Sequence, residues 1–232
     1  MSAAAPSYEA ISEGAGRLGL RARGGFHPLP TDGAPRLSSG GEPGTVVLIG
    51  NVGPEFWESA GPAVGKIAEA NPLDRWVVKQ VGDLATSFGA EVVFPFGGPP
   101  HWPFQRWAQR AEAVAPSPIG ILIHPDYGLW HAYRAALLFA SRLDLPVRVE
   151  RPVPCISCGD KPCLTTCPVG AFQPTGYAVA TCVAHVGTSA GADCASHGCA
   201  ARRACPVGRP YTYPVEESRF HMRAFVRAMT PR

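Results

Sequence analysis

Apolar residues in the first 150 positions form short blocks separated by polar stretches rich in Gly and Pro. Three blocks are short and nearly continuous, as expected of buried strands: Thr45–Gly50, Glu91–Phe96 and Gly120–His124. Two further segments repeat apolar residues at helical spacing, residues 73–88 and Phe104–Val114. The pattern therefore predicts strands interleaved with helices, which is typical of a layered α/β or α+β domain.

The boundaries of these elements carry their own signals. Asn71-Pro72 is typical of a helix start, with Asn71 as the N-cap, and Gly89 is a C-cap. Trp130–Phe139 fits a strand or a helix equally well, and Leu145–Glu150 is expected to be extended.

Composition divides the chain into four expected parts. Residues 1–44 are rich in Gly, Ala, Ser and Pro, which predicts an irregular N-terminal arm. Residues 45–150 form the α/β domain, 151–213 a cysteine module, and 214–232 a C-terminal helix at about Val215–Met229.

Size and charge limit the function classes. The chain has 232 residues, of which 46% are apolar, so it can bury a sizeable core. Its net charge is only +3, so its overall electrostatic field gives no reason to expect binding to nucleic acid or membranes. The first 25 residues lack the apolar stretch of a secretory signal, and no run of 18 apolar residues occurs. We expect a cytoplasmic protein without a membrane partner. In a reducing compartment, clustered cysteines bind metal more often than they form disulfides.

All eight cysteines lie between Cys155 and Cys205. The first run, Cys155-x2-Cys158-x4-Cys163-x3-Cys167-Pro, is close to the bacterial iron–sulfur pattern, in which a fourth cysteine precedes proline. Cys167 and Cys205 are both followed by Pro-Val-Gly. This pattern favours iron–sulfur chemistry.

In two-cluster ferredoxins, the cysteine before proline binds the other cluster. The same rule divides the thiols here into a first quartet (Cys155, Cys158, Cys163 and Cys205) and a second quartet (Cys167, Cys182, Cys194 and Cys199). Each quartet would hold one [4Fe–4S] cluster.

Two departures leave alternatives open. Four residues rather than two separate Cys158 from Cys163, and His197 stands where a cysteine is expected. The second cluster could therefore be absent or histidine-ligated. The main rival is a tetrahedral zinc site, in which Cys155 and Cys158 pair with Cys163 and Cys167. Disulfides or redox thiols are the third alternative.

Two stretches resemble known families. Cys163-x3-Cys167-Pro-Val-Gly-Ala-Phe172, with Gly176-Tyr177 and Thr181-Cys182, is similar to the iron–sulfur module of epoxyqueuosine reductases and reductive dehalogenases. The stretch Ile123–Arg134 resembles the cobalamin-processing (decyanase/dealkylase) chaperones. The resemblance implies an α+β fold: a nitroreductase-like, cobalamin-chaperone-like domain with a central antiparallel sheet, followed by a two-cluster ferredoxin-like module. It also favours a strand for Trp130–Phe139.

The resemblance further implies a corrinoid or substrate site in the 45–150 domain. His124, Tyr127, Trp130 and Arg134 would line it. In the alternative structural interpretation, His124 caps a strand end, Arg134 pairs with Asp126, and the two aromatic residues belong to the core.

We therefore expect an iron–sulfur redox protein that binds two [4Fe–4S] clusters and passes electrons to an acceptor in its N-terminal domain, with a corrinoid such as cobalamin as the candidate. A ferredoxin-type electron carrier and a structural zinc protein are the alternatives, and oxidoreductase activity belongs to the first interpretation. The implied partner is a low-potential electron donor. Arg219, Arg223 and Arg227 share one helix face that could dock such a donor, could bind nucleic acid, or could be solvated.

Overall fold

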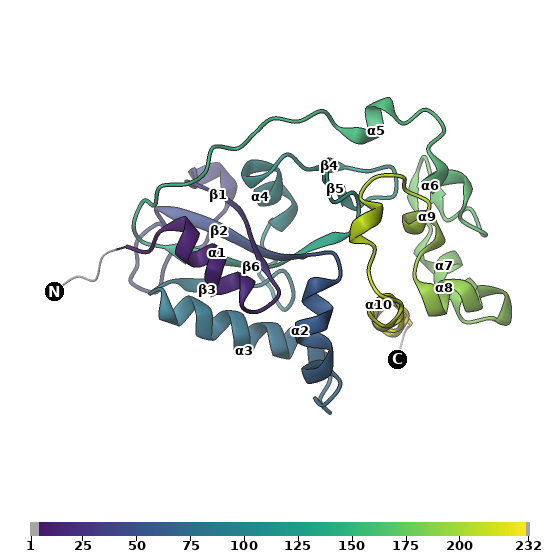
Figure 1. Ribbon diagram of the computed structural model, residues 1–232, viewed down its shortest axis with the longest axis horizontal. Coiled ribbons are helices and arrows are strands. Elements are labelled where there is room, and N and C mark those ends of the chain that lie inside the picture. Colours follow the sequence, from purple (N-terminus) through teal and green to yellow (C-terminus); the bar gives the residue numbers. More distant parts are fainter. Residues whose placement is uncertain (1–4, 231–232) are drawn as a thin grey trace. The chain divides into compact units, whose positions relative to one another are not determined.

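The computed structural model describes residues 5–230, which form two compact units (Figure 1). The sheet unit contains the residues up to Ala113 together with His131–Glu150. The thiol unit contains Val114–Trp130 together with the residues from Arg151 onward. The stretch before β6 thus belongs to the same unit as the cysteines.

The sheet unit is built on one antiparallel sheet with the strand order β1-β2-β6-β3. The bounds are β1 (Arg21–Phe26), β2 (Thr45–Val52), β3 (Glu91–Val93) and β6 (His131–Phe139). All eight residues of β2 are buried, and Val47 lies opposite Leu137 of β6. A strand whose two faces are both covered by other parts of the protein has a continuous run of apolar residues. This explains the apolar run at Thr45–Gly50.

Helices cover this sheet. They are α1 (Tyr8–Gly16), α2 (Glu55–Val64), α3 (Pro72–Ser87) and α4 (Phe104–Ala111), with a 3-10 turn η1 (Pro30–Asp32). α3 packs against β3 and β6, and α1 and α4 pack against β1. The central antiparallel sheet flanked by helices is confirmed.

The irregular arm expected over residues 1–44 is wrong for α1 and β1. Ser7 caps α1 by accepting a hydrogen bond from the backbone N–H of Ala10, and β1 joins the sheet as an edge strand. Small residues dominate this segment, yet Ile11 and Leu20 are buried to within 1% exposure. A few well-placed apolar side chains suffice, because the rest of the core supplies the opposite face. Residues 1–4 of the expected arm lie outside the described part of the chain.

The other expectations for the sheet unit fare as follows. Residues 131–139 form strand β6, as the resemblance favoured, and α3 matches its expected range. Asn71 is the N-cap and Pro72 the first residue of α3, as expected, although Asn71 adopts the left-handed conformation, with φ 54°, and its side chain makes no capping hydrogen bond. β3 ends at Val93, short of Phe96, because Pro95 lacks the N–H that a ladder needs.

The thiol unit consists of short elements. They are β4 (Ala115–Pro116), β5 (Leu122–Ile123), α5 (Pro154–Ser157), α6 (Pro162–Thr165), β7 (Phe172–Gln173), β8 (Gly176–Tyr177), α7 (Val179–Val186), η2 (Ser189–Gly191), α8 (Ala192–His197), α9 (Ala200–Arg203), η3 (Arg209–Tyr211) and α10 (Val215–Met229). The C-terminal helix is therefore confirmed. β5 is shorter than expected, because Gly120 turns with φ 83° and His124 forms only an isolated bridge to Gly128.

Thiols form part of this unit's small core. Cys163 and Cys205 are buried together with apolar residues from both chain segments, namely Ile119, Ile123, Leu129 and Ala201. The two segments meet closely: a Cβ on Gly128 would lie 2.0 Å from the Val207 carbonyl oxygen, and one on Gly208 would lie 2.2 Å from that of Tyr127. Only glycine fits at such an approach.

None of the described helices combines the length and hydrophobicity that a membrane crossing requires.

Candidate functional site

The structure gathers the first quartet around α5 and α6. Cys155 lies in α5, Cys158 follows it, Cys163 lies in α6, and Cys205 comes after α9. Burial raises the pKa of Cys155, and the neighbouring thiols Cys205, Cys163 and Cys158 raise it further. The pKa of Cys163 is likewise raised by burial and then by Cys205 and Cys158. These mutual effects show that the four thiols of the first quartet lie within electrostatic range of one another.

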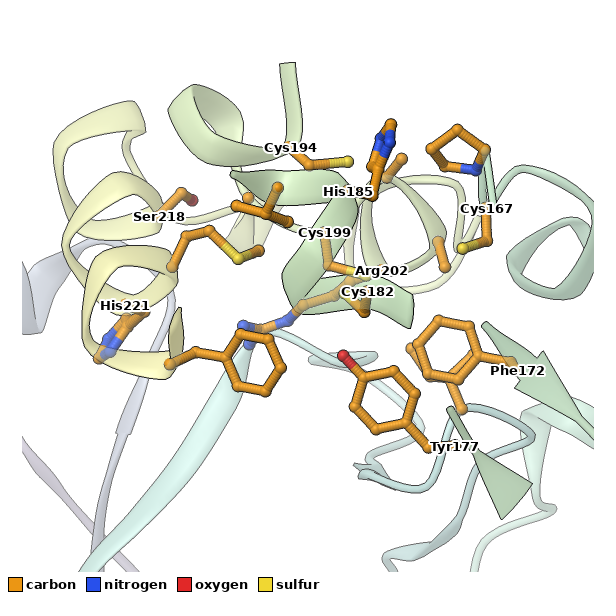
Figure 2. Close-up of a pocket in the computed structure, with 18 of the residues that line it drawn as sticks. Cys167, Phe172, Tyr177, Cys182, His185, Cys194, Cys199, Arg202, Ser218 and His221 are labelled. Carbon is orange, nitrogen blue, oxygen red and sulfur yellow. The ribbon is translucent and has the colours of Figure 1, made fainter. Parts of the chain in front are cut away.

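The second quartet lines a cavity of about 470 Å³ (Figure 2). Cys182 comes from α7, Cys194 from α8, Cys199 from the start of α9, and Cys167 from the loop after α6. The pKa of Cys199 is raised, mainly because the thiol is buried, and the nearby thiols Cys182 and Cys194 raise it further. The quartet that the sequence predicts thus surrounds a single cavity.

Backbone N–H groups point at several of these sulfur atoms. The N–H of Ala171 donates to the sulfur of Cys167 at 3.4 Å, and amides of Ala201 and Arg202 lower the pKa of Cys199. The Val207 amide does the same for Cys205. These donors stabilise a thiolate, the form of cysteine that binds metal.

The two Cys-Pro-Val-Gly segments share one backbone feature. Gly170 has φ 54° and Gly208 has φ 74°, both in the left-handed region that favours glycine. Each glycine lies three residues after its cysteine, so the repeat seen in the sequence corresponds to a shared left-handed glycine.

Aromatic side chains line part of the cavity. Phe172 and Tyr177 stack across the β7–β8 hairpin at 4.8 Å, and Phe225 of α10 stacks on Tyr177 at 6.3 Å. Burial raises the pKa of Tyr177 well above its ordinary value, and a hydrogen bond to Cys182 raises it further. The phenol therefore keeps its proton beside the second quartet.

Arg202 also reaches the cavity. Its guanidinium lies 4.6 Å from the ring of Trp130 and 4.5 Å from that of Tyr213, and it donates to the Leu129 carbonyl at 3.0 and 2.5 Å. A positive charge is thus fixed by two rings and one carbonyl within the thiol unit.

Three histidines line the cavity as well: His185, His197 and His221. Nδ1 of His197 lies 3.1 Å from a carboxylate oxygen of Asp193, and its side chain is 49% exposed. The sequence pointed to His197 alone. His185 lies one helical turn after Cys182 in α7, so the sequence spacing could have placed it beside the second quartet. His221 belongs to α10, which is distant in sequence from the thiols, and no local pattern indicates it.

Among residues 5–230, no three His, Cys, Asp or Glu side chains stand close enough together to share one metal ion.

The four residues expected to line a corrinoid site are divided between the units. Tyr127 and His124 stack at 4.1 Å, and Nδ1 of His124 accepts hydrogen bonds from the N–H groups of Asp126 and Tyr127. Trp130 is 3% exposed. These three belong to the thiol unit, and Asp126 pairs there with Arg151 at 2.9 Å.

The fourth residue, Arg134, belongs to the sheet unit. Its Nε donates to Oδ1 of Asn51 at 2.9 Å, and its guanidinium lies 5.2 Å from the ring of Phe56. Its charge also lowers the pKa of Asp74, although burial dominates and raises that pKa overall.

Sequence reasoning missed a buried polar network in the sheet unit. Arg23, 1% exposed, donates to both carboxylate oxygens of Glu112 at 2.8 and 2.6 Å. The hydroxyl of Tyr133 donates to the same carboxylate at 2.8 Å, and Nδ1 of His131 lies 3.3 Å from Arg23. No motif marks these residues, because their pairing depends on sheet register.

No protein-family model matches the chain, and neither does any curated protein. Solved structures do resemble it. A crystal structure of epoxyqueuosine reductase with a tRNA-Tyr epoxyqueuosine-modified stem loop superposes with a TM-score of 0.52 at 13% identity, covering 90% of this chain and 68% of that one. A selenomethionine-labelled epoxyqueuosine reductase gives a TM-score of 0.52 at 14% identity over the same shares.

The B12-trafficking protein CblC of C. elegans, a human MMACHC homologue, superposes with a TM-score of 0.50 at 14% identity, covering 97% of this chain and 98% of that one. At these identities the comparison establishes the fold. The resemblance inferred from the sequence is confirmed at that level: the chain has a mixed α/β fold similar to those of epoxyqueuosine reductase and CblC.

Proposed function

We propose that the chain is an iron–sulfur redox protein whose thiol unit is a ferredoxin-like module for two [4Fe–4S] clusters. The first quartet would hold one cluster and the second quartet the other. Two proteins with the same fold point toward related chemistry, one a reductase and the other a B12-trafficking protein.

The observation that carries this proposal is the grouping of the thiols. A zinc site built from the first run would need Cys167 beside Cys155, Cys158 and Cys163. Of the two cysteines that precede proline, Cys205 is the one whose charge raises the pKa values of Cys155 and Cys163, whereas Cys167 lines the cavity of the second quartet. This exchange of the proline-linked cysteines is the arrangement of two-cluster ferredoxins.

The donor set fits such a cluster. A cubane is roughly 5 Å across, so four thiolates around a cavity of about 470 Å³ have room for one. Several of these thiols have pKa values raised by burial and by one another, so ionising them costs free energy until iron binds. Metal binding then releases protons and stabilises the fold.

The clusters would take up and release single electrons, and this chain's residues would set how readily they do so. Burial and backbone N–H groups act on the sulfur atoms. A low-potential donor would supply the electrons, and the chain would act as an oxidoreductase if its acceptor is a substrate.

A corrinoid is the candidate acceptor, and Arg134 of the sheet unit is the residue that we propose contacts it. The fold shared with CblC supports this choice. A nucleic-acid partner is the second candidate, because an epoxyqueuosine reductase of the same fold was crystallised with a tRNA stem loop. Arg219, Arg223 and Arg227 of α10 offer a basic helix face for it.

The first test counts iron and sulfide after anaerobic purification. We expect about eight of each per chain, together with an EPR signal on dithionite reduction. Cys158→Ala and Cys182→Ala should each remove about half of the iron, because each breaks one quartet. Ser157→Ala and Thr181→Ala, the adjacent positions, should keep all of it. One zinc ion and no sulfide in the wild type would contradict the proposal.

The second test titrates the iron-loaded protein with hydroxocobalamin. Binding should shift the corrin absorption bands, and Arg134→Ala should weaken binding about tenfold, the worth of one charge-assisted hydrogen bond. Both cluster signals should persist in that variant. Unshifted bands in the wild type would favour the ferredoxin-type carrier instead.

A further inference from the structure

The hydroxyl of Tyr177 approaches the second quartet from the β7–β8 hairpin (Figure 2). Tyr177 and Cys182 line the same cavity, and the Cys182 side chain, as a hydrogen-bond partner, raises the pKa of this hydroxyl together with the charges of Cys199 and Cys167. One phenol is therefore near three of the four sulfur atoms in this quartet.

Packing fixes the direction of that hydroxyl. Tyr177 lies opposite Phe172 in the hairpin register, and the two rings stack with an interplanar angle of 14°. Phe225 of α10 stacks on the same ring at 21°. A ring held by two neighbours loses little further freedom when its hydroxyl donates, which favours the hydrogen bond.

The first quartet has a different surrounding. The cations that act on it are Lys161, near Cys155, and Arg209, near Cys205, and both are exposed. Solvent and salt screen exposed charges. Its other stabilising contacts are backbone N–H groups, which the second quartet also has.

We propose that the Tyr177 hydroxyl raises the reduction potential of the cluster in the second quartet above that of the first. This inference rests on the proposed function. Reduction adds one electron from the donor to the cluster, breaks no bond and needs no proton. The added negative charge spreads onto the sulfur ligands, and a hydrogen bond to one of them stabilises the reduced state more than the oxidised state.

The consequence is a direction for electron flow within the thiol unit. An electron that enters at the first cluster is more stable on the second. At equilibrium the electron is then found mainly on the cluster of the second quartet. The Tyr177 hydrogen bond contributes to the difference in reduction potential between the two clusters.

The experiment is an anaerobic potentiometric titration of Tyr177→Phe followed by EPR. The phenylalanine ring keeps the stacking on Phe172 and Phe225 and loses only the hydroxyl. We expect the reduction equilibrium of one cluster to become about tenfold less favourable, which is about 59 mV for a one-electron couple. The other cluster should be unchanged.

The shifted signal is assigned by repeating the substitution in the Cys158→Ala background, which retains only the second cluster. Tyr211→Phe is the matched control, since Tyr211 lies in the same unit and packs edge-on against Tyr127. It should shift neither potential.

The outcomes separate the two proposals. A wild type without about eight iron and eight sulfide contradicts the proposed function itself. Full loading with no shift in Tyr177→Phe, a shift in the first cluster, or an equal shift in Tyr211→Phe overturns the role of Tyr177 alone. If Cys158→Ala does not fold, Cys155→Ser in the first quartet provides the same assignment.

Discussion

The two units of this protein reach a folded state by different means. In the sheet unit, β2 and β6 pair along their whole lengths and every residue of β2 is buried. In the thiol unit, elements of two to four residues are common, and thiols take part in the buried core. Apolar burial stabilises the first unit, whereas the proposed clusters would contribute more to the stability of the second.

Removing the iron should give the largest effect and tests this contrast directly. Anaerobic chelation should abolish most hydrogen-exchange protection in α6–α9, because these helices are short and the small buried core of their unit includes the thiols themselves. Protection in β2 and β6 should be unchanged. Peptide-level hydrogen exchange of the full chain, with and without chelator, measures both. Equal loss of protection in the two units would break the comparison.

Glu112→Ala should produce the next largest effect, which is a loss of stability in the sheet unit. It leaves Arg23 buried at 1% exposure without its carboxylate, at a cost of about 3–5 kcal/mol in the free energy of unfolding. Urea unfolding followed by tryptophan fluorescence suits this unit, since it holds most of the tryptophans: Trp57, Trp76, Trp102 and Trp107.

The iron content of Glu112→Ala should equal that of the wild type, provided that the folded protein is compared. Glu58→Ala, at an exposed position of α2, is the control and should change the free energy of unfolding by no more than about 0.5 kcal/mol. A loss below 1 kcal/mol in Glu112→Ala would show that the remaining partners of Arg23 suffice.

The sequence predicted much of the sheet unit because local periodicity and burial agree there. The strand at Thr45 and the helices at Pro72 and Phe104 follow directly from apolar spacing, as does the helix at Val215 in the thiol unit. It did not reveal α1 and β1, where small residues weaken the pattern and the opposite face of the core supplies the burial. The strand at His131 needed the family resemblance, because its apolar run fits two periods.

For the candidate site, cysteine spacing and the ligand order of two-cluster ferredoxins predicted the division into two quartets, and spacing by itself left the zinc alternative open. The tertiary structure decided what surrounds them. Tyr177 and Arg202 lie close in sequence to Cys182 and Cys199, whereas His221 and Phe225 reach the cavity of the second quartet from α10, a helix that shares no motif with the thiols. Such contacts depend on packing between segments distant in sequence, and no local pattern encodes that distance.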